Sequence, residues 1–354
     1  MTKAALLRAA THVAFDAATT ESLLNIGAIN VVRASDCLIV GPSRLDALEH
    51  ARTRETWRSL FEESSFRDES GEPWDRLYSP DIRWGLPVVL WVSVSLRERV
   101  NLWRACRWLR HLGIASGEVL VAEFEFVFGT INRSCEPPIM PRFNCSASVA
   151  HHPNEVLLDR LDTACPWPVE RYEHAVRLWE CYVDDNPLLF VESCIRGVDG
   201  FPELAPLWGL LSCFFPRRAA GGTLRLSRLD ELILTILSTE ENLTAVSVFC
   251  HESQFGLDLR ELLSCTGDLF LRARLDQWAK HGSAAVERAP GPRPPNAGSP
   301  MRSKVYRLTE RGMQLRDKGL DRLTDAPSLP IAGTEAYSPS APWVLLEDGR
   351  LSRL

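Results

Sequence analysis

The sequence predicts an α/β N-terminal domain with a mostly parallel sheet, a helical connecting region and a winged-helix-like C-terminal domain. Strand-like and helical patterns alternate over the first 130 residues, as they do in βαβ units. The run 87–95, PVVLWVSVS, is almost continuously apolar, which is typical of a strand buried on both faces. Short helical patterns after residue 222 precede a Pro- and Gly-rich stretch, a strand-like run and a last helix. We therefore expect four segments: 1–130, 131–222, 223–324 and a Pro- and Ser-rich tail at 325–354 that could close as a small hairpin around its Glu-Asp-Gly turn.

Composition excludes several classes of protein. A chain of 354 residues is long enough for two domains, each with its own core. Its net charge of −6 argues against a protein that coats nucleic acid with its whole surface. The longest apolar run, Val88–Leu96, is less than half of the roughly 20 residues that a membrane helix needs. Arg8 interrupts the apolar start and no cleavage pattern follows, so we expect a cytoplasmic protein with no membrane partner.

The ten cysteines give no sign of a metal site. They are scattered, none forms a CxxC pair, and no zinc-ligand spacing is present. Several lie in apolar company, as in WECYV and LLSCFF, which is typical of reduced cysteines that pack as small hydrophobic side chains. We expect no bound metal, and no motif identifies a cofactor.

The α/β part can be divided into elements. THVAF at 11–15 reads as a strand, and TTESLLNIG at 19–27 as a helix that begins with capping hydroxyls and ends at Gly27. One or two strands are expected in 29–42 and a helix in 43–63. Ser95 and Glu98 form the S-x-x-E pattern of a capping box, which predicts the start of a helix over 95–113. A further strand is expected at 118–128.

Ligands of open α/β sheets bind beyond the carboxyl ends of the strands, so polar residues at these junctions are candidates. The candidate ligand-binding residues are His12, Asp16, Thr19, Asp36, Gly41, Ser93, Ser95 and Glu98. Helix starts favour anions, which indicates a small polar or anionic ligand. Each candidate also has a structural explanation: capping for Thr19, Ser95 and Glu98, a turn for Asp36, and a packed core for His12. No glycine-rich phosphate motif and no nucleophile motif is present, so no catalytic residue is identified.

The N-terminal part resembles a bacterial family known as domain of unknown function 1835. The resemblance rests on HVAF, SDCLIVGP and VVLWVSVSLRE, with matches at His12, Asp36, Leu38, Gly41, Pro42, Trp91, Ser93 and Glu98. The family's Gly-Asp-Ser position is Asp16-Ala17-Ala18 here, which implies an altered or lost site. The segment GDLFLRARLDQWAKHG and the later YRL are similar to domain of unknown function 3658, which often follows the first family. The resemblance implies an organisation and no activity.

The C-terminal part poses the question of nucleic-acid binding. We expect a wing strand at Val305–Leu308, then a helix capped by Thr309 that packs on LDELILTIL. The run 267–282 would be the helix that enters a major groove, yet Leu271, Leu275 and Trp278 share one face that is more typical of a core. Between residues 280 and 322, ten Lys or Arg accompany four Asp or Glu. If DNA is bound, we expect phosphate contacts from Arg302, Lys304, Arg307 and Arg311.

Three functional hypotheses follow. The favoured one is a ligand-binding or regulatory protein, whose α/β domain binds the small polar or anionic molecule and whose C-terminal domain contacts a protein partner. The first alternative is an enzyme that uses Asp36 or Glu98 as acid or base at the strand ends. The second is a DNA-binding regulator that acts through the basic wing. The sequence decides none of the three, because it joins no nucleophile to a base and its basic footprint is modest.

Overall fold

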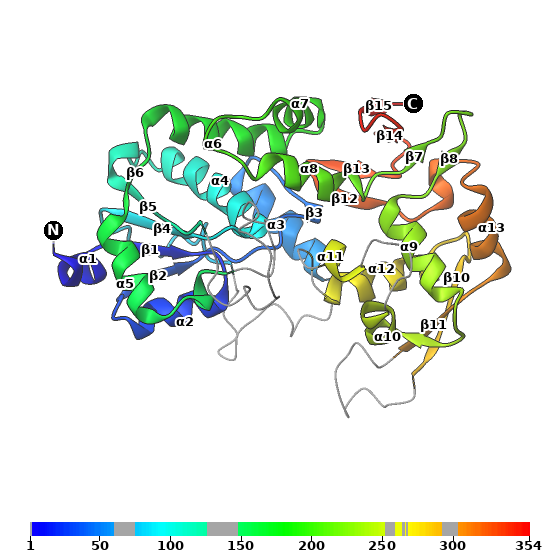
Figure 1. Ribbon diagram of the computed structural model, residues 1–354, viewed down its shortest axis with the longest axis horizontal. Coiled ribbons are helices and arrows are strands. Elements are labelled where there is room, and N and C mark those ends of the chain that lie inside the picture. The colour runs from blue at the N-terminus through cyan, green and yellow to red at the C-terminus, as the bar shows by residue number, and fades with distance from the viewer. Residues whose placement is uncertain are drawn as a thin grey trace, which may run out of the picture. The chain divides into compact units, whose positions relative to one another are not determined.

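A computed structural model describes residues 2–59, 75–125, 148–251, 259–263, 266, 268–291 and 304–354. These residues form two compact units. Figure 1 colours the chain by residue number, from blue at the N-terminus to red at the C-terminus. The first unit comprises the described residues up to 206, except 39–42 and 59. The second unit comprises residues 39–42 and 59 and the described residues from 207 to 354. The expected segments differ from this division, because 148–206 belong to the first unit and 325–354 are an ordered part of the second.

The first unit is built on a five-stranded sheet with the order β2-β1-β4-β5-β6. Its strands are β1 (Thr11–Ala14), β2 (Asn30–Arg33), β4 (Val88–Val92), β5 (Val119–Glu123) and β6 (Cys165–Pro166). The first four are parallel, and β6 pairs antiparallel with β5. Every residue of β4 is buried, and this strand pairs with both β1 and β5. The prediction of a mostly parallel sheet around a central apolar strand is confirmed.

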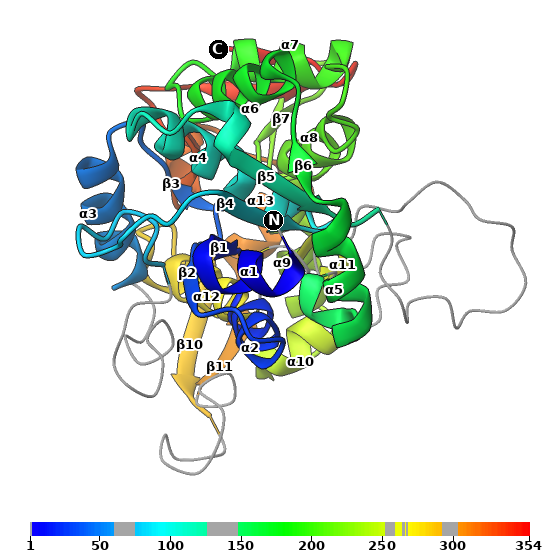
Figure 2. The same cartoon turned by 90° about the vertical axis from the view of Figure 1, so that its left-hand side faces the viewer.

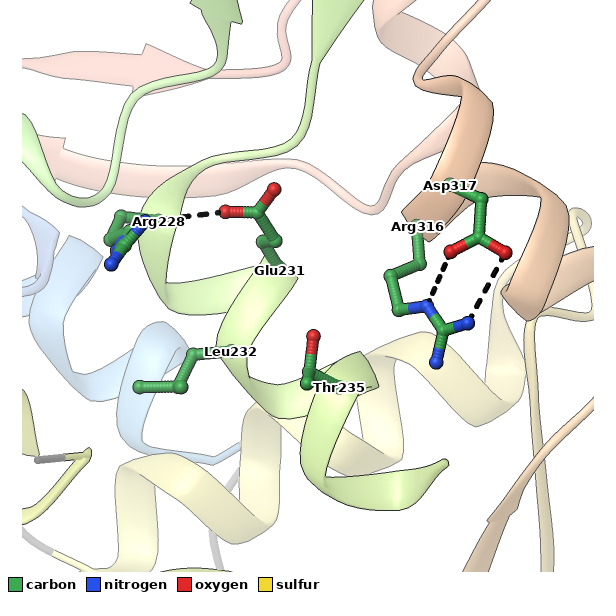
Figure 3. A pocket seen from close by; sticks show the side chains of 6 residues that line it. All are labelled: Arg228, Glu231, Leu232, Thr235, Arg316 and Asp317. Atoms are coloured by element: carbon green, nitrogen blue, oxygen red, sulfur yellow. Dashed lines mark hydrogen bonds and ion pairs between the residues drawn. The ribbon is translucent and has the colours of Figure 1, made fainter. Parts of the chain in front are cut away.

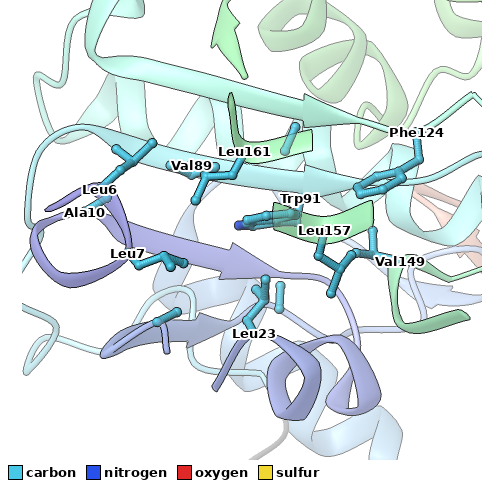
Figure 4. Packing of buried hydrophobic residues seen from close by; sticks show 13 residues of the cluster. Leu6, Leu7, Ala10, Leu23, Val89, Trp91, Phe124, Val149, Leu157 and Leu161 are labelled. Atoms are coloured by element: carbon cyan, nitrogen blue, oxygen red, sulfur yellow. The ribbon is translucent and has the colours of Figure 1, made fainter. Parts of the chain in front are cut away.

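Helices cover both faces of this sheet, as Figure 2 shows. The helices of the first unit are α1 (Lys3–Ala9), α2 (Ala17–Asn25), α3 (Ala47–Arg58), α4 (Leu96–His111), α5 (Asn154–Thr163), α6 (Val169–Tyr182) and α7 (Leu188–Arg196). Helices α1, α2 and α5 lie on one face, and α4 and α6 pack together on the other. On the first of these faces, Leu7, Leu23 and Leu161 pack against Trp91 of β4 in one hydrophobic cluster (Figure 4).

The sequence places the ends of these helices only in part. Gly113, with φ of +77°, follows the C-cap of α4 as expected, because glycine tolerates this left-handed backbone. Helix α2, in contrast, is capped by Asp16 and begins at Ala17 rather than at Thr19. No helix in the described part of the chain combines the length and the apolar character that a membrane crossing requires.

The second unit contains a three-stranded antiparallel sheet with the order β10-β11-β9 and a set of short helices. Its elements begin, in chain order, with α8 (Leu204–Ser212, whose first residues belong to the first unit), β7 (Arg217–Arg218), β8 (Leu224–Arg225), α9 (Arg228–Leu237), β9 (Leu243–Thr244), α10 (Ala245–Cys250), α11 (Leu259–Leu263), α12 (Asp268–Lys280), β10 (Val286–Pro290), β11 (Lys304–Leu308) and α13 (Glu310–Lys318). Thr309 caps α13 by accepting a hydrogen bond from the Gly312 amide at 3.1 Å, and α13 packs on α9. The predicted strand, cap and packing of this last helix are therefore confirmed.

The C-terminal 30 residues complete two further sheets of the second unit. Strand β12 (Leu329–Ala332) pairs with β13 (Thr334–Ala336) and, in parallel, with β3 (Gly41–Pro42). Strand β14 (Trp343–Leu346) pairs antiparallel with β15 (Leu351–Arg353) and in parallel with β7. The small hairpin around Glu-Asp-Gly is present, and residues 217–218 of the expected connecting region are a strand.

Candidate functional site

The order of strands in the first unit locates a ligand-binding position. From β1 the chain passes through α2 to β2 on one side, whereas β4 lies on the other side of β1. The order therefore reverses between β1 and β4, and open α/β sheets bind ligands beyond the carboxyl ends of the strands at such a switch point. Asp16 follows β1 at this edge, and Ser93, Ser95 and Glu98 follow β4. The fold brings together the residues that the sequence placed after these two strands.

Asp16 is a buried carboxylate held by hydroxyl and amide donors. Its Oδ1 accepts a hydrogen bond from the Thr19 amide at 2.7 Å, which is the cap of α2. Its Oδ2 accepts from Ser148 Oγ at 2.6 Å and from Thr19 Oγ1 at 2.8 Å. Burial opposes the charge on Asp16, but the donors of Ser148 and Thr19 outweigh it and lower the pKa of the carboxyl. Asp16 is therefore ionised at neutral pH.

Glu98 lies close to Asp16 and has the opposite protonation state. Its Oε2 accepts a hydrogen bond from the Ser93 amide at 2.6 Å, and its Oε1 accepts from the Val149 amide at 3.4 Å. Burial, followed by the negative charge of Asp16, raises the pKa of Glu98 to about 8. Glu98 therefore carries a proton at neutral pH, which lets it donate to the neighbouring carboxylate.

The expected capping box of α4 is wrong. Ser95 occupies the N-cap position, but its side chain makes no capping hydrogen bond. Glu98 reaches past Ser95 to the Ser93 amide, and the Ser95 amide in turn donates to Ser93 Oγ at 3.1 Å. The carboxyl of the S-x-x-E pattern therefore bonds at the end of β4, and the pattern does not cap the first turn of α4.

The pair formed by Asp16 and Glu98 has no positively charged partner among the described residues. The groups that shift the pKa of both side chains are burial, each other, and the hydroxyls and amides around them. The other two completely buried aspartates with lowered pKa values, Asp36 and Asp230, each face an arginine. A buried charge without a counterion is costly, so among the described residues this pair calls for a functional explanation.

Asp36 is not part of this pair. Arg54 donates to both of its oxygens, at 3.0 and 2.6 Å, and Arg58 lies 2.8 Å from it. Burial opposes its charge, but Arg54 and Arg58 hold the pKa of Asp36 well below its ordinary value. The partners of Asp36 come from α3 and those of Asp16 from α2 and residue 148, so the two carboxylates share none of these partners. A ligand shared by Asp36 and the residues of the pair stays a prediction.

The Asp36 network extends through α4. Arg104, fully buried, donates to Asp75 at 2.6 and 3.0 Å, to the Ala34 carbonyl at 3.2 Å and to Asn101 Oδ1 at 2.8 Å. Asn101 Nδ2 donates to the Asp36 carbonyl at 2.8 Å. Asp36 was predicted to be a turn residue or a ligand residue. The network shows it as the centre of a buried ion cluster that joins α3 and α4 to the end of β2.

His12 and Gly41 have partners other than the pair. His12 is buried, and its Nδ1 accepts from Trp91 Nε1 at 3.1 Å, while burial lowers the pKa of the imidazole below its usual value. It is a neutral core histidine, which was the structural alternative. Gly41, with φ of +86°, pairs with Ile331 in the second unit, where glycine permits the turn of the backbone.

Ser148 and Val149 supply two of the donors at the pair and were not among the predicted residues. They belong to the three-residue 3₁₀ helix η3 (Val149–His151) and the residue before it. This stretch follows a segment rich in Pro, Cys and Asn and shows no hydrophobic periodicity. A single Ser-x-x-His capping signal, in which Ser148 Oγ accepts from the Ala150 amide at 3.1 Å, is the only local pattern that could have drawn attention to it.

The second unit has its own buried carboxylate, at Asp230. Arg274 donates to it through Nε and Nη2, each at 2.8 Å, and Trp278 Nε1 and Tyr337 OH donate at the same distance. Arg274 and Trp278 lie on α12, and Leu271 and Leu275 of this helix are also fully buried, as predicted. The Ser328 carbonyl also accepts from Arg274 Nη1 at 3.1 Å, so the segment leading into β12 contacts the helix that would enter a major groove.

Three of the four expected phosphate contacts lie close to carboxylates. Lys304 lies 2.8 Å from Asp276, Arg307 pairs with Glu287, and Arg311 lies 3.8 and 3.9 Å from Asp321 and Asp325. Arg302, the fourth expected contact, lies outside the described residues. Partly exposed pairs of this kind contribute little to stability, but they leave a reduced positive potential for phosphate groups.

A surface pocket of about 430 Å³ lies between α9 and α13 in the second unit (Figure 3). It is lined by Arg228, Glu231, Leu232, Thr235, Arg316 and Asp317. Arg316 is paired with Asp317 at 2.7 Å, and Arg217 with Glu231 at the same distance. The charges in this pocket thus have partners within the protein, which distinguishes it from the pair at the switch point.

Comparisons with protein-family models, with curated proteins and with solved structures find no match. Within the described ranges, no group of three or more His, Cys, Asp or Glu side chains has the arrangement of a metal site. The candidate site is therefore defined by its own geometry: a neutral and an ionised carboxyl, side by side at a switch point of a parallel sheet, with hydroxyl groups around them.

Proposed function

We propose that the first unit binds a small polar ligand at the switch point between β1 and β4, and that the protein is a ligand-binding or regulatory protein. The observation that carries this proposal is the pair of buried carboxyls, Asp16 and Glu98, without a positively charged partner among the described residues. Ligand sites of α/β sheets lie at this position. Clusters of groups with strongly perturbed pKa values gather at functional sites.

The chemistry of the pair favours hydroxyl or ammonium groups in the ligand over an anion. The N-terminus of α2 is already occupied by the Asp16 carboxylate, so it does not offer its amides to a ligand anion. The carboxylate accepts hydrogen bonds from donors, and protonated Glu98 supplies one further donor. We therefore narrow the expected class from a polar or anionic molecule to a neutral or cationic polar one.

A screen of small polar compounds tests the proposal. Amines, amino sugars and polyols are compared with carboxylates and phosphates by the thermal unfolding midpoint of the full-length protein, followed by calorimetric titration of the hits. We expect stabilising ligands among the first group, and loss of their binding in Asp16→Asn. An anion that binds equally well to the Asp16→Asn variant would place the ligand site elsewhere.

The opposed protonation states of Asp16 and Glu98 favour a second candidate, an enzyme that uses the pair for acid–base chemistry. Many enzymes use two carboxyls with different pKa values. The neutral carboxyl acts as the acid, and the ionised carboxyl acts as the base. Glu98 would donate a proton and Asp16 would accept one. Turnover of a bound ligand that falls as pH rises through about 8 would support this candidate.

We further propose that the second unit has a winged-helix-like fold that contacts a protein partner. The order α9, β9, α10, α11, α12, β10, β11, with a three-stranded antiparallel sheet, supports this fold. The burial of α12 and the carboxylate partners of Lys304, Arg307 and Arg311 speak against DNA as the partner. The relationship to domains of unknown function 1835 and 3658 also remains a proposal, and it rests on the motif residues alone.

A further inference from the structure

The two carboxyls at the switch point are covered by a segment from a distant part of the sequence. Ser148 Oγ lies 2.6 Å from Asp16 Oδ2 and 3.2 Å from Thr19 Oγ1, and the Val149 amide lies 3.4 Å from Glu98 Oε1. Asp16 is only 6% exposed and Glu98 only 1%. A ligand that donates hydrogen bonds to these carboxyls needs the positions that Ser148 and Val149 now occupy.

This segment is held by side-chain packing, including the fully buried Val149, and not by pairing with the sheet. Residues 148–152 form a single 3₁₀ turn that packs against α2. Val149 inserts its side chain beside Leu23 and Leu157, as Figure 4 shows, and His152 lies against the Phe124 ring at 4.4 Å between centroids. No strand of the sheet depends on residues 148–152 for its pairing. The turn can therefore leave the carboxyls while the sheet stays intact.

We infer that residues 148–152 are a cover for the switch-point site, whose Ser148 hydroxyl and Val149 amide stand in for the donors of the ligand and must move away before it binds. This inference rests on the proposed function of the site and adds its regulation. Of the two stand-in donors, Ser148 makes the short hydrogen bond to a charged acceptor, whereas the Val149 amide makes a long one. The Ser148 hydroxyl is therefore the main contact that holds this cover closed.

Opening of the cover can be tested by chemical labelling of the carboxyls in the full-length protein. A water-soluble carbodiimide with an amine nucleophile modifies accessible carboxyl groups, and mass spectrometry of peptides measures the labelling of Asp16 and Glu98. Loss of a hydrogen bond to a charged acceptor shifts an opening equilibrium by roughly tenfold. We expect Ser148→Ala to label at least several-fold faster than the wild-type protein. Ser193→Ala, which removes an exposed hydroxyl that bonds only within α7, is the matched control and should label at the wild-type rate.

Amide hydrogen exchange of the wild-type protein provides a second measurement that needs no variant. The amides of Val149, Ala150 and His152 should exchange much faster than those of β4, because the cover opens without unfolding of the sheet. Equal exchange rates in the two places, or equal labelling of Ser148→Ala and the wild-type protein, would overturn the inference. A ligand screen without hits would count against the proposed function but not against a cover that is seen to open.

Discussion

Arg54 holds Asp36 through two hydrogen bonds, from Nε to Oδ2 at 3.0 Å and from Nη2 to Oδ1 at 2.6 Å, with both side chains buried. Arg58 and Arg104 add their charges to the same carboxylate. This cluster explains the aspartate of the S-D-C-L-I-V-G-P motif as a structural residue, since it joins α3 to the end of β2.

Asp36→Asn should therefore destabilise the protein severely. The substitution keeps the shape of the side chain and removes its charge, which leaves Arg54 and Arg58 without their shared counterion. Breaking a buried pair in this way costs about 3–5 kcal/mol. Chemical denaturation measures the loss. Asp81→Asn, which removes an exposed partner of Arg76, is the control and should change stability little. Similar stabilities of the two variants would contradict the structural role of Asp36.

Tyr337→Phe should destabilise the second unit. The Tyr337 hydroxyl donates to Asp230 at 2.8 Å and accepts from the Ser227 amide at 2.6 Å, all within the core. Its removal leaves a buried amide and a buried carboxylate each short of one partner, at a cost of about 1–3 kcal/mol. Tyr306→Phe is the control, because its hydroxyl bonds to the half-buried Asp276. Thermal unfolding should show the larger loss for Tyr337→Phe, and the reverse order would refute this account of the Asp230 cluster.

The full-length protein should not bind duplex DNA. Lys304, Arg307 and Arg311 already lie near carboxylates, and most of the side chains of α12 are buried. Fluorescence anisotropy with a labelled duplex at about 50 mM salt, where phosphate contacts are strong, measures this directly. Binding that weakens steeply with salt, with a slope reduced by about one for each of the three residues changed to Ala, would restore the basic-wing mechanism.

The parts of the fold that were predictable are those with strong local signals. The apolar run 87–95 identified the central strand, because burial on both faces leaves no room for polar alternation. Thr309 identified the start of α13, since a hydroxyl before a helical pattern has few other uses. The C-terminal 30 residues gave no such signal beyond one turn. Their strands are short, and their pairing partners, such as β3 and β7, lie far away in the sequence.

The candidate site was only half predictable for the same reason. Asp16 and Glu98 could be found because each follows a recognisable strand, and parallel strands end at the same edge of a sheet. Their opposite protonation states depend on burial and on each other, which no sequence pattern encodes. Asp36 was chosen as a candidate because it also follows a strand, and no sequence pattern indicates its partner Arg54 on α3. Ser148 stands 132 residues from the carboxylate it contacts.

Glu98→Gln should change how stability depends on pH. Glu98 has a folded-state pKa of about 8, above its ordinary value, so the unfolded protein holds fewer protons on it between about pH 4.5 and 8. The wild-type protein therefore loses stability as pH rises through this range, by an amount on the order of a few kcal/mol. Glu98→Gln should lack this decline. Glu123 provides the contrast. Burial opposes its charge, but Arg99 outweighs burial and lowers the pKa of the carboxyl, so the stability that Glu123 contributes is lost as pH falls. Parallel stability curves for Glu98→Gln and the wild-type protein would contradict this assignment.

The most direct test of the carboxyl pair is the titration of the Glu98 side-chain carbon, followed by carbon-13 NMR in the wild-type protein and in Asp16→Asn. The account predicts that Glu98 titrates near pH 8 in the wild-type protein, and at a clearly lower pH once the negative charge of Asp16 is gone. A Glu98 carboxyl that titrates below pH 5 in the wild-type protein, or that ignores the Asp16→Asn substitution, would show that the two groups are not a coupled pair.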